Sequence, residues 1–203
     1  MKKLVLTAAL ALVALLSVTA SAFAAHNATI RNAGEIATAS SGKVTFRAGE
    51  ISIECNLTLS GTLAGTISNL ERPEERQSLG SIRGVAWREC AGGEVSSVLN
   101  TPWNILYTGE TGAMPNSVTS VQFTIQNAQF LLSTFGGFVR CLYAGEAPVT
   151  MAATATRTAG TYTSGLIRTT ESSFAKVSGA LCPEAGRMTG SFNMTPVQTI
   201  TVS

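Results

Sequence analysis

The chain of 203 residues contains no aspartate and a single histidine, His26. A Ser-His-Asp triad therefore cannot be assembled, and calcium loops built from several aspartates are excluded. The sequence also lacks the Gly-Lys-Ser/Thr segment of a phosphate-binding loop. These absences remove most hydrolytic, calcium-dependent and nucleotide-dependent functions. We expect a protein that is not an enzyme and that carries no cofactor and no metal.

An excess of charge of one sign is lacking as well. Two of the 14 basic residues, Lys2 and Lys3, stand at the very start, so 12 basic residues face 12 acidic ones in the rest of the chain. Balanced charge gives no electrostatic reason to expect nucleic acid or an anionic membrane as partner. A cell-surface component and another copy of the chain remain as partner classes.

The first residues have the pattern of a secretory leader. Lys2 and Lys3 precede an apolar run over residues 4–18, and Ala22-Phe23-Ala24 supplies the small-x-small pattern of a cleavage site. The run is shorter than the ~20 residues that span a bilayer. We predict a Sec-type signal peptide over residues 1–24, a single secreted domain over residues 25–203, and no integral membrane segment after cleavage.

Four cysteines stand at positions 55, 90, 141 and 182. An even number in an oxidising compartment predicts two disulfides, for which three pairings exist. We favour Cys55–Cys90 and Cys141–Cys182, because each pair lies on neighbouring strand-like segments in one half of the chain. A zinc site is the alternative, but the close Cys-x-x-Cys spacing that zinc prefers is missing.

Apolar and polar residues alternate over much of the chain. Residues 51–59 place Ile, Ile, Cys, Leu and Leu at every second position, which is typical of a strand with one face in the core. The apolar parity changes near Asn127, which indicates a β-bulge or a new strand. Frequent glycine-containing turns separate these runs. The pattern predicts an all-β fold, an antiparallel β-sandwich or a flattened β-barrel. A polar insertion over residues 69–78 is predicted to be a mobile loop.

Two glutamates are the candidates for hydrolytic chemistry. Glu54 and Glu89 each precede a cysteine, so a disulfide between Cys55 and Cys90 would place both carboxylates on the opposite face of the sheet. A pair of carboxylates suffices for glycoside hydrolysis. The alternative, which we favour, is a solvated outer face with surface ion pairs.

Aromatic residues are the candidates for a binding surface. Trp103 and Tyr107, with Trp87, either stack on sugars or pack in the core, and we favour the core. Phe135 and Phe138 flank Gly136-Gly137 and either present an apolar tip to a partner or fold back onto the sheet. We expect them to fold back.

Long stretches of the chain resemble a group of small secreted β-rich proteins from high-GC Gram-positive bacteria. The resemblance covers nearly all of the chain after the leader and implies a fold and a compartment, but no site residues. It lies in residues 53–63 (IECNLTLSGTL), 102–107 (PWNILY), 141–145 (CLYAG) and 190–202 (GSFNMTPVQTITV).

A second resemblance concerns the start of the predicted domain. Residues 42–46 (GKVTF), followed by 49–51 (GEI) and Cys55, are similar to the opening strands of chaperone-assembled pilins. That resemblance implies a subunit completed by a strand of its neighbour. The chain departs from the pilin pattern because its last residues lack the aromatic signature and because two disulfides are more than such subunits carry.

The predicted function follows from these observations. We expect a secreted, non-catalytic β-domain with a structural or binding role at or near the cell surface. A polymerising pilin-like subunit that accepts residues 25–40 of a neighbour is the first alternative. A carbohydrate-active protein that uses Glu54 and Glu89 is the second.

Overall fold

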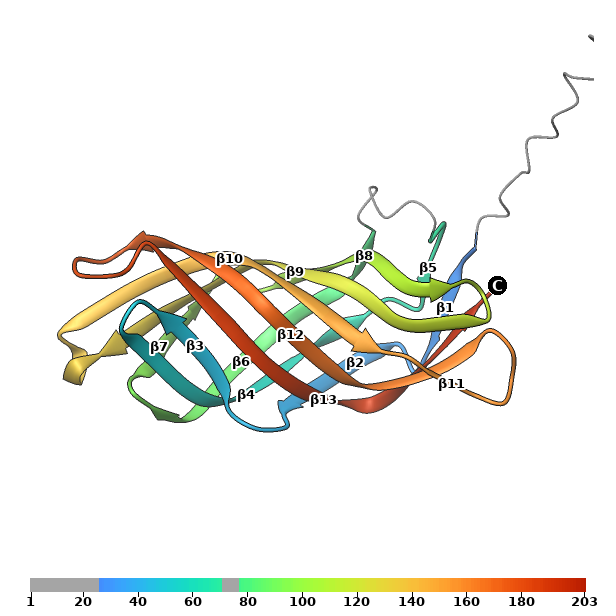
Figure 1. The fold of residues 1–203 in the computed structure, drawn as a ribbon, viewed down its shortest axis with the longest axis horizontal. Helices are drawn as coiled ribbons and strands as arrows, with labels where there is room; N and C mark the ends of the chain where they lie inside the picture. Colours follow the sequence, from blue (N-terminus) through green and yellow to red (C-terminus); the bar gives the residue numbers. More distant parts are fainter. Residues whose placement is uncertain (1–25, 71–76) are drawn as a thin grey trace, which may run out of the picture.

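The computed structural model describes residues 26–70 and 77–203 (Figure 1). The predicted signal peptide and residues 71–76 of the polar insertion lie outside this range. Within the described ranges, no helix has the length and apolarity needed to cross a membrane.

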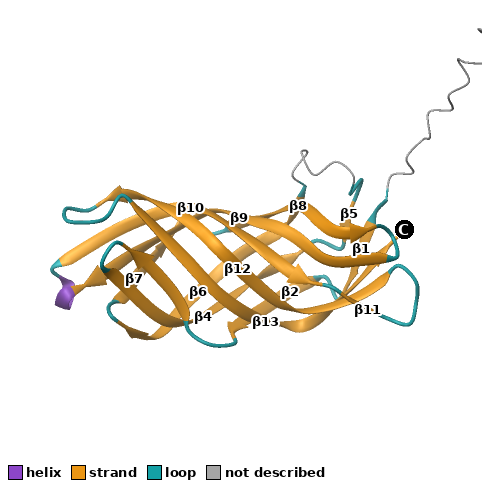
Figure 2. Ribbon diagram, viewed as in Figure 1, coloured by secondary structure: helices purple, strands orange, loops and turns teal. Residues whose placement is uncertain are grey.

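The described chain is built almost entirely of strands, joined by turns and one short 3-10 turn (Figure 2). The elements are β1 (Ala28–Arg31), β2 (Gly34–Ser40), β3 (Val44–Ala48), β4 (Ile51–Leu63), β5 (Thr66–Ile67), β6 (Ser78–Ala91), β7 (Glu94–Leu99), β8 (Trp103–Ala113), β9 (Ser117–Thr134), η2 (Phe135–Gly137), β10 (Val139–Ala152), β11 (Thr154–Ala155), β12 (Thr161–Ser178) and β13 (Ala185–Val202).

The strands form one antiparallel sheet that closes on itself. Hydrogen bonding runs from β12 through β10, β9, β8, β6, β4 and β2 to β13, and β13 pairs with β12 again. β2 and β3 both pair with β13 and share one position in the wall, as β7 and β8 do beside β9. The all-β prediction is confirmed, and of its two forms the structure shows the barrel.

The core lies inside the barrel because side chains alternate between its two faces. In β4 the residues Ile51, Ile53, Cys55 and Leu57 are buried, as the alternation predicts, and the residues between them face outward. The predicted irregularity near Asn127 is a bulge, since Gln126 and Asn127 together oppose Glu146 of β10. Asn127 has a φ of 61°, which asparagine tolerates better than most residues.

The two disulfides have the predicted pairing. Cys55 of β4 is bonded to Cys90 of β6, and Cys141 of β10 is bonded to Cys182 in the β12–β13 hairpin. The first bond joins neighbouring strands of the wall. The second ties the β12–β13 hairpin to the start of β10.

One end of the interior is filled by an aromatic cluster. Phe130 lies at its centre, with ring centroids 4.9 Å from Phe174, 5.4 Å from Phe46 and 5.9 Å from Trp87. Tyr143 packs on Phe46 at 5.0 Å. Such contacts add about 0.5–1.5 kcal/mol each to the hydrophobic gain from burying the rings.

Tyr143 makes the stability of the barrel sensitive to alkaline pH. Its hydroxyl donates a hydrogen bond to the Pro183 carbonyl at 2.9 Å, and burial raises its pKa, with a further contribution from the negative charge of Glu184. The folded state therefore disfavours the phenolate. The part of the free energy of unfolding that depends on a protonated Tyr143 is fully present below the unfolded pKa of about 10. It is lost as the pH rises toward the higher pKa of the folded state.

We expect Tyr143→Phe to flatten the decline in stability above about pH 10. At neutral pH the variant loses about 1 kcal/mol with the hydrogen bond to Pro183. Urea unfolding of both proteins between pH 8 and 11 measures the difference in slope. An unchanged slope in the variant would show that other groups cause the alkaline loss.

Candidate functional site

The barrel encloses an apolar cavity of about 90 Å³, called the interior cavity below. Its lining comes from nearly every strand of the wall, and the cavity presents no polar surface. Barrels of about eight strands are just wide enough to be filled by side chains or to hold one small ligand. An apolar cavity of this kind stays dry and can take up a small apolar molecule.

Methionine is concentrated around the interior cavity. Met114, Met151, Met188 and Met194 all line it, and the only other methionine of the chain is Met1. Methionine has an unbranched, polarizable side chain that adapts to differently shaped neighbours. The lining is therefore deformable, and the cavity can be enlarged by changes of methionine rotamer.

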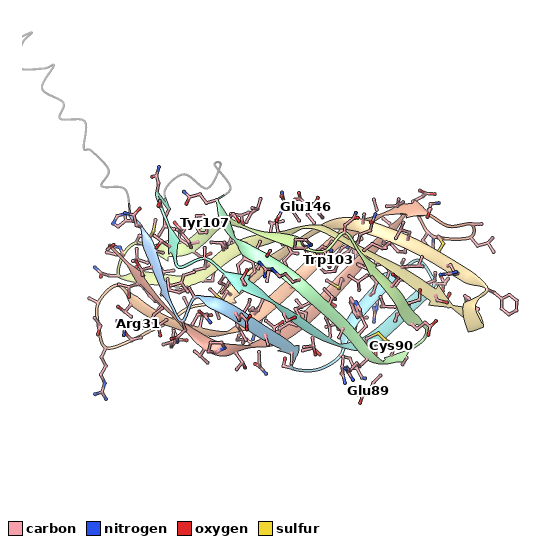
Figure 3. The ribbon with its side chains drawn as sticks, turned by 180° about the vertical axis from the view of Figure 1, so that it is seen from behind. Arg31, Glu89, Cys90, Trp103, Tyr107 and Glu146 are labelled. Carbon is pink, nitrogen blue, oxygen red and sulfur yellow. A yellow bond between two sulfur atoms is a disulfide. The ribbon has the colours of Figure 1, made fainter. Side chains whose placement is uncertain are left out.

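Trp103 and Tyr107 lie inside the barrel wall (Figure 3). They are 5% and 1% exposed and line the interior cavity, so of the two interpretations the structure shows the favoured one, packing in the core, and not an exposed platform for sugars. The Trp103 Nε1 donates to the Leu99 carbonyl at 2.9 Å. The Tyr107 hydroxyl donates to the Glu110 carboxylate. The polar atoms of both side chains are thus hydrogen-bonded within the protein, and the rings contribute apolar surface to the cavity.

The wall has a seam between β6 and β7. β6 pairs with β8 only as far as Ile82 and Trp103, and beyond that point no backbone pairing joins β6 to β7 within the described residues. Trp87 lies on this stretch of β6 and lines both the interior cavity and a depression on the outside of the barrel. Trp87 is therefore the residue that the linings of the cavity and the depression share.

The turn between β9 and β10 presents two phenylalanines to solvent. Phe135 is 73% exposed and Phe138 is 93% exposed. Our expectation that both rings fold back onto the sheet is wrong, and the alternative, an apolar tip, is what the structure shows. The backbone of this turn is unusual, since Phe135, Gly136 and Gly137 all have positive φ.

Glu54 and Glu89 are exposed, and the register does not place them opposite each other. Glu54 pairs with Ala91, because a register shift follows it in the β4–β6 ladder. The Glu89 carboxylate accepts a hydrogen bond from Asn56 Nδ2 at 2.5 Å and lies 3.7 Å from Lys43 Nζ. Figure 3 shows Glu89 beside Cys90 at the edge of the barrel. The surface depression that includes Glu89 does not include Glu54. Hydrolysis by this pair stays a prediction.

The interior cavity is the feature that sequence reasoning missed. Its signal was present, since Met188 and Met194 alternate in step with Phe192 and therefore face inward with it. Alternation alone cannot tell a filled core from one with a remaining cavity, because both need the same apolar positions. Among the described residues, no group of three or more His, Cys, Asp or Glu side chains is arranged to hold a metal ion.

Comparison with known proteins yields a family but no individual relative. No curated protein and no solved structure matches the chain. The resemblances to a Gram-positive secreted group and to pilins therefore stay predictions. One family model, described as alkane oxidation protein activator PraA/PraB-like, matches residues 1–202. Because the match covers almost the whole chain, the protein belongs to the PraA/PraB-like family.

Proposed function

We propose that this protein is a secreted, non-catalytic barrel that binds an unfunctionalised hydrocarbon chain in its interior cavity, at or near the cell surface. The observation that carries the proposal is a cavity with no polar surface and with four methionines in its lining. The description of the family as activators of alkane oxidation agrees with a hydrocarbon ligand.

The chemistry of the cavity favours an alkane over an alcohol or a fatty acid. Each methylene moved from water into the barrel gains about 0.8 kcal/mol. A hydroxyl or carboxylate loses its hydrogen bonds to water on entering this lining, at a cost of a few kcal/mol unless it reaches Thr38 Oγ1 or Trp87 Nε1, two buried lining atoms without a hydrogen-bond partner. Binding of an alkane thus gains from every carbon, whereas a head group cancels the gain of several.

The size of the cavity sets a condition on binding. A designed apolar cavity of about 150 Å³ takes up benzene, and the interior cavity measures about 90 Å³. A chain of several carbons enters only when side chains move. Met151, Met188 and Met194 are the side chains best able to do so, because their rotamers interconvert with little change in packing energy.

A binding role rather than catalysis is supported by the composition. The chain has no aspartate, and His26, its only histidine, stands outside the strands at the start of the described range. Two disulfides agree with a compartment outside the cytoplasm. Strand β2, which a polymerising subunit would donate to a neighbour, is paired on both sides within its own chain. The polymerising alternative gains no support from that arrangement.

The test uses the methionine methyl groups as reporters. We expect n-octane to shift the methyl resonances of Met114, Met151, Met188 and Met194 in protein labelled at the methionine methyl carbons. Octanol is expected to act more weakly, because few lining atoms such as Thr38 Oγ1 are free to bind its hydroxyl, and octanoate not at all, because burial of its charge costs far more. Unchanged methyl resonances in octane-saturated buffer would refute the proposal.

A matched pair of variants locates the ligand. Ala128 is buried and lines the cavity, whereas Ala39 faces outward on β2. Ala128→Leu is expected to fill the cavity, to lose the response to octane, and to cost about 1–3 kcal/mol through overpacking. Ala39→Leu is expected to keep the response. Equal responses in the two variants would place the hydrocarbon outside the barrel.

A further inference from the structure

Two turns at one end of the barrel expose large apolar side chains. Phe135 and Phe138 belong to the β9–β10 turn, Leu181 belongs to the β12–β13 turn, and Val177 lies beside that turn at the end of strand β12. Leu181 is 87% exposed, close to the 93% of Phe138. We call these four residues the apolar tip. Two other large exposed hydrophobic residues in the described chain, Leu99 and Val197, lie on the strands β7 and β13.

The two segments that carry these side chains lie at the same end of the barrel. Strands β10 and β12 pair up to Leu142 and Ser178, next to both turns. The Cys141–Cys182 disulfide then joins the start of β10 to the residue after Leu181. Figure 1 shows both turns at the same end of the barrel, away from the C-terminus. The disulfide therefore ties the two segments of the apolar tip to each other through the start of β10.

The backbone of the apolar tip carries an additional cost. Phe135 has a φ of 52° and Leu181 a φ of 64°, in the left-handed region that bulky residues rarely adopt. Both residues are exposed, so burial of their side chains does not compensate for the strain. Strained residues that persist in this way cluster at functional sites.

The area of the apolar tip argues against a stable protein partner. Large side chains such as Phe offer about 150–250 Å² each, so the four together present on the order of 500 Å². A stable protein–protein interface buries about 800 Å² on each partner. A fluid apolar phase does not require a complementary surface and accepts separate side chains one by one.

Charged groups of both signs lie directly behind the apolar tip. The Lys176 ammonium contacts the Glu184 carboxylate within the β12–β13 hairpin, and Arg140 is exposed two residues after Phe138. Side chains of both signs at this position complement the positive and negative groups of zwitterionic phospholipid headgroups. A bare hydrocarbon surface offers no charged groups to these side chains. The apolar side chains lie at the end of the barrel and the charged groups lie nearer its middle. This order matches the boundary between acyl chains and headgroups in a bilayer.

We propose that the apolar tip inserts into the surface of a zwitterionic phospholipid bilayer and docks the barrel there by one end. The docking is carried by residues outside the interior cavity and does not depend on the proposed hydrocarbon binding. It places the depression shared by Phe135 and Trp87 next to the lipid, on the outer side of the wall of the interior cavity.

Vesicle flotation tests the docking. The oxidised protein without its predicted leader is floated with phosphatidylcholine vesicles at low and high salt. We expect it to float with the lipid at both salt concentrations, because the attraction is apolar. Phe135→Ser/Phe138→Ser is expected to lower the partition coefficient by roughly 100-fold or more, since each ring contributes roughly 10-fold to 100-fold. Val197→Ser, an exposed hydrophobic residue on strand β13, is the matched control and should float as the parent does.

Three results would overturn the docking proposal. The first is a parent protein that stays out of the lipid fraction, and the second is equal flotation of the double serine variant. The third is self-association in the absence of lipid that the double variant abolishes, which would assign the apolar tip to a second copy of the chain. The octane response of the methionine methyls is measured on the same variants and should be unchanged. Failure of docking and failure of hydrocarbon binding are therefore separate outcomes.

Discussion

Phe130→Ala is expected to lower the free energy of unfolding by about 3–5 kcal/mol, the range for a buried phenylalanine that leaves a cavity. Phe130 is 1% exposed and touches the rings of Phe46, Trp87 and Phe174. The neighbours come from three separate strands and are anchored by the closed sheet, so they cannot collapse into the space. Urea unfolding followed by tryptophan fluorescence measures the loss.

Phe138→Ala is the control for this experiment. It removes the same side chain from a site that is almost fully exposed, and we expect a change within about 0.5 kcal/mol. Comparison of the two variants separates the effect of burial on the free energy of unfolding from the effect of replacing phenylalanine by alanine. A loss below about 1 kcal/mol for Phe130→Ala would contradict the tight packing of the aromatic cluster.

The Phe130→Ala variant also provides an independent test of the proposed hydrocarbon binding. Phe130 lines the interior cavity, so its truncation enlarges the space available to a ligand. A ligand that binds only the folded state raises stability according to its concentration and affinity. We expect octane-saturated buffer to recover more stability in Phe130→Ala than in the parent protein. Equal recovery would show that the ligand does not occupy the space next to Phe130.

Removal of the Cys141–Cys182 disulfide is expected to cost about 4 kcal/mol in the chain-entropy model. The bond closes a loop with a sequence separation of 41 residues, and both cysteines are buried. The variant Cys141→Ala/Cys182→Ala leaves no free thiol and no buried hydroxyl at these sites. Urea unfolding of the variant and of the parent protein, both with Cys55–Cys90 oxidised, measures the cost, and equal stability of the two would contradict the expectation.

The second disulfide supplies a comparison. Cys55–Cys90 closes a loop with a separation of 35 residues, so loop entropy alone predicts nearly the same cost for its removal. The structure distinguishes the two bonds by location, because Cys141–Cys182 holds the hairpin of Leu181 and Cys55–Cys90 joins two paired strands. We expect faster amide exchange in residues 177–184 only when Cys141–Cys182 is removed. Faster exchange there in both variants would mean that the barrel as a whole is loosened.

Several features of the fold were predictable because they follow from short-range patterns. The alternation over residues 51–59 identified β4 and its inward face, since period-two alternation has one structural interpretation at that length. The change of parity at Asn127 identified the bulge in β9. The disulfide pairing was predictable because loops within each half of the chain are the short ones.

Fewer features of the candidate site than of the fold could be predicted from the sequence. Aromatic side chains such as Trp103 and Tyr107 occur both in sugar-binding platforms and in protein cores. Only the structure shows that these two point inward from β8 and line a cavity. Phe135 and Phe138 were expected to be covered, because hydrophobic residues usually are. Their exposure, and the positive φ at three consecutive residues of the turn, are properties of the folded chain that composition does not reveal.

By itself, the sequence determined the strand-rich architecture, the inward and outward residues of its strands, the two disulfides and the absence of a triad. Each of these depends on residue type and on spacing over a few positions. The tertiary structure alone decided that β13 meets β12 and closes the sheet, that no backbone pairing joins β6 to β7 in the described wall, and that a methionine-lined cavity remains inside. These features depend on which residues far apart in the chain come together, and on how completely their side chains fill the enclosed space. Both are set by packing in three dimensions, for which the order of residues along a strand provides no local signal.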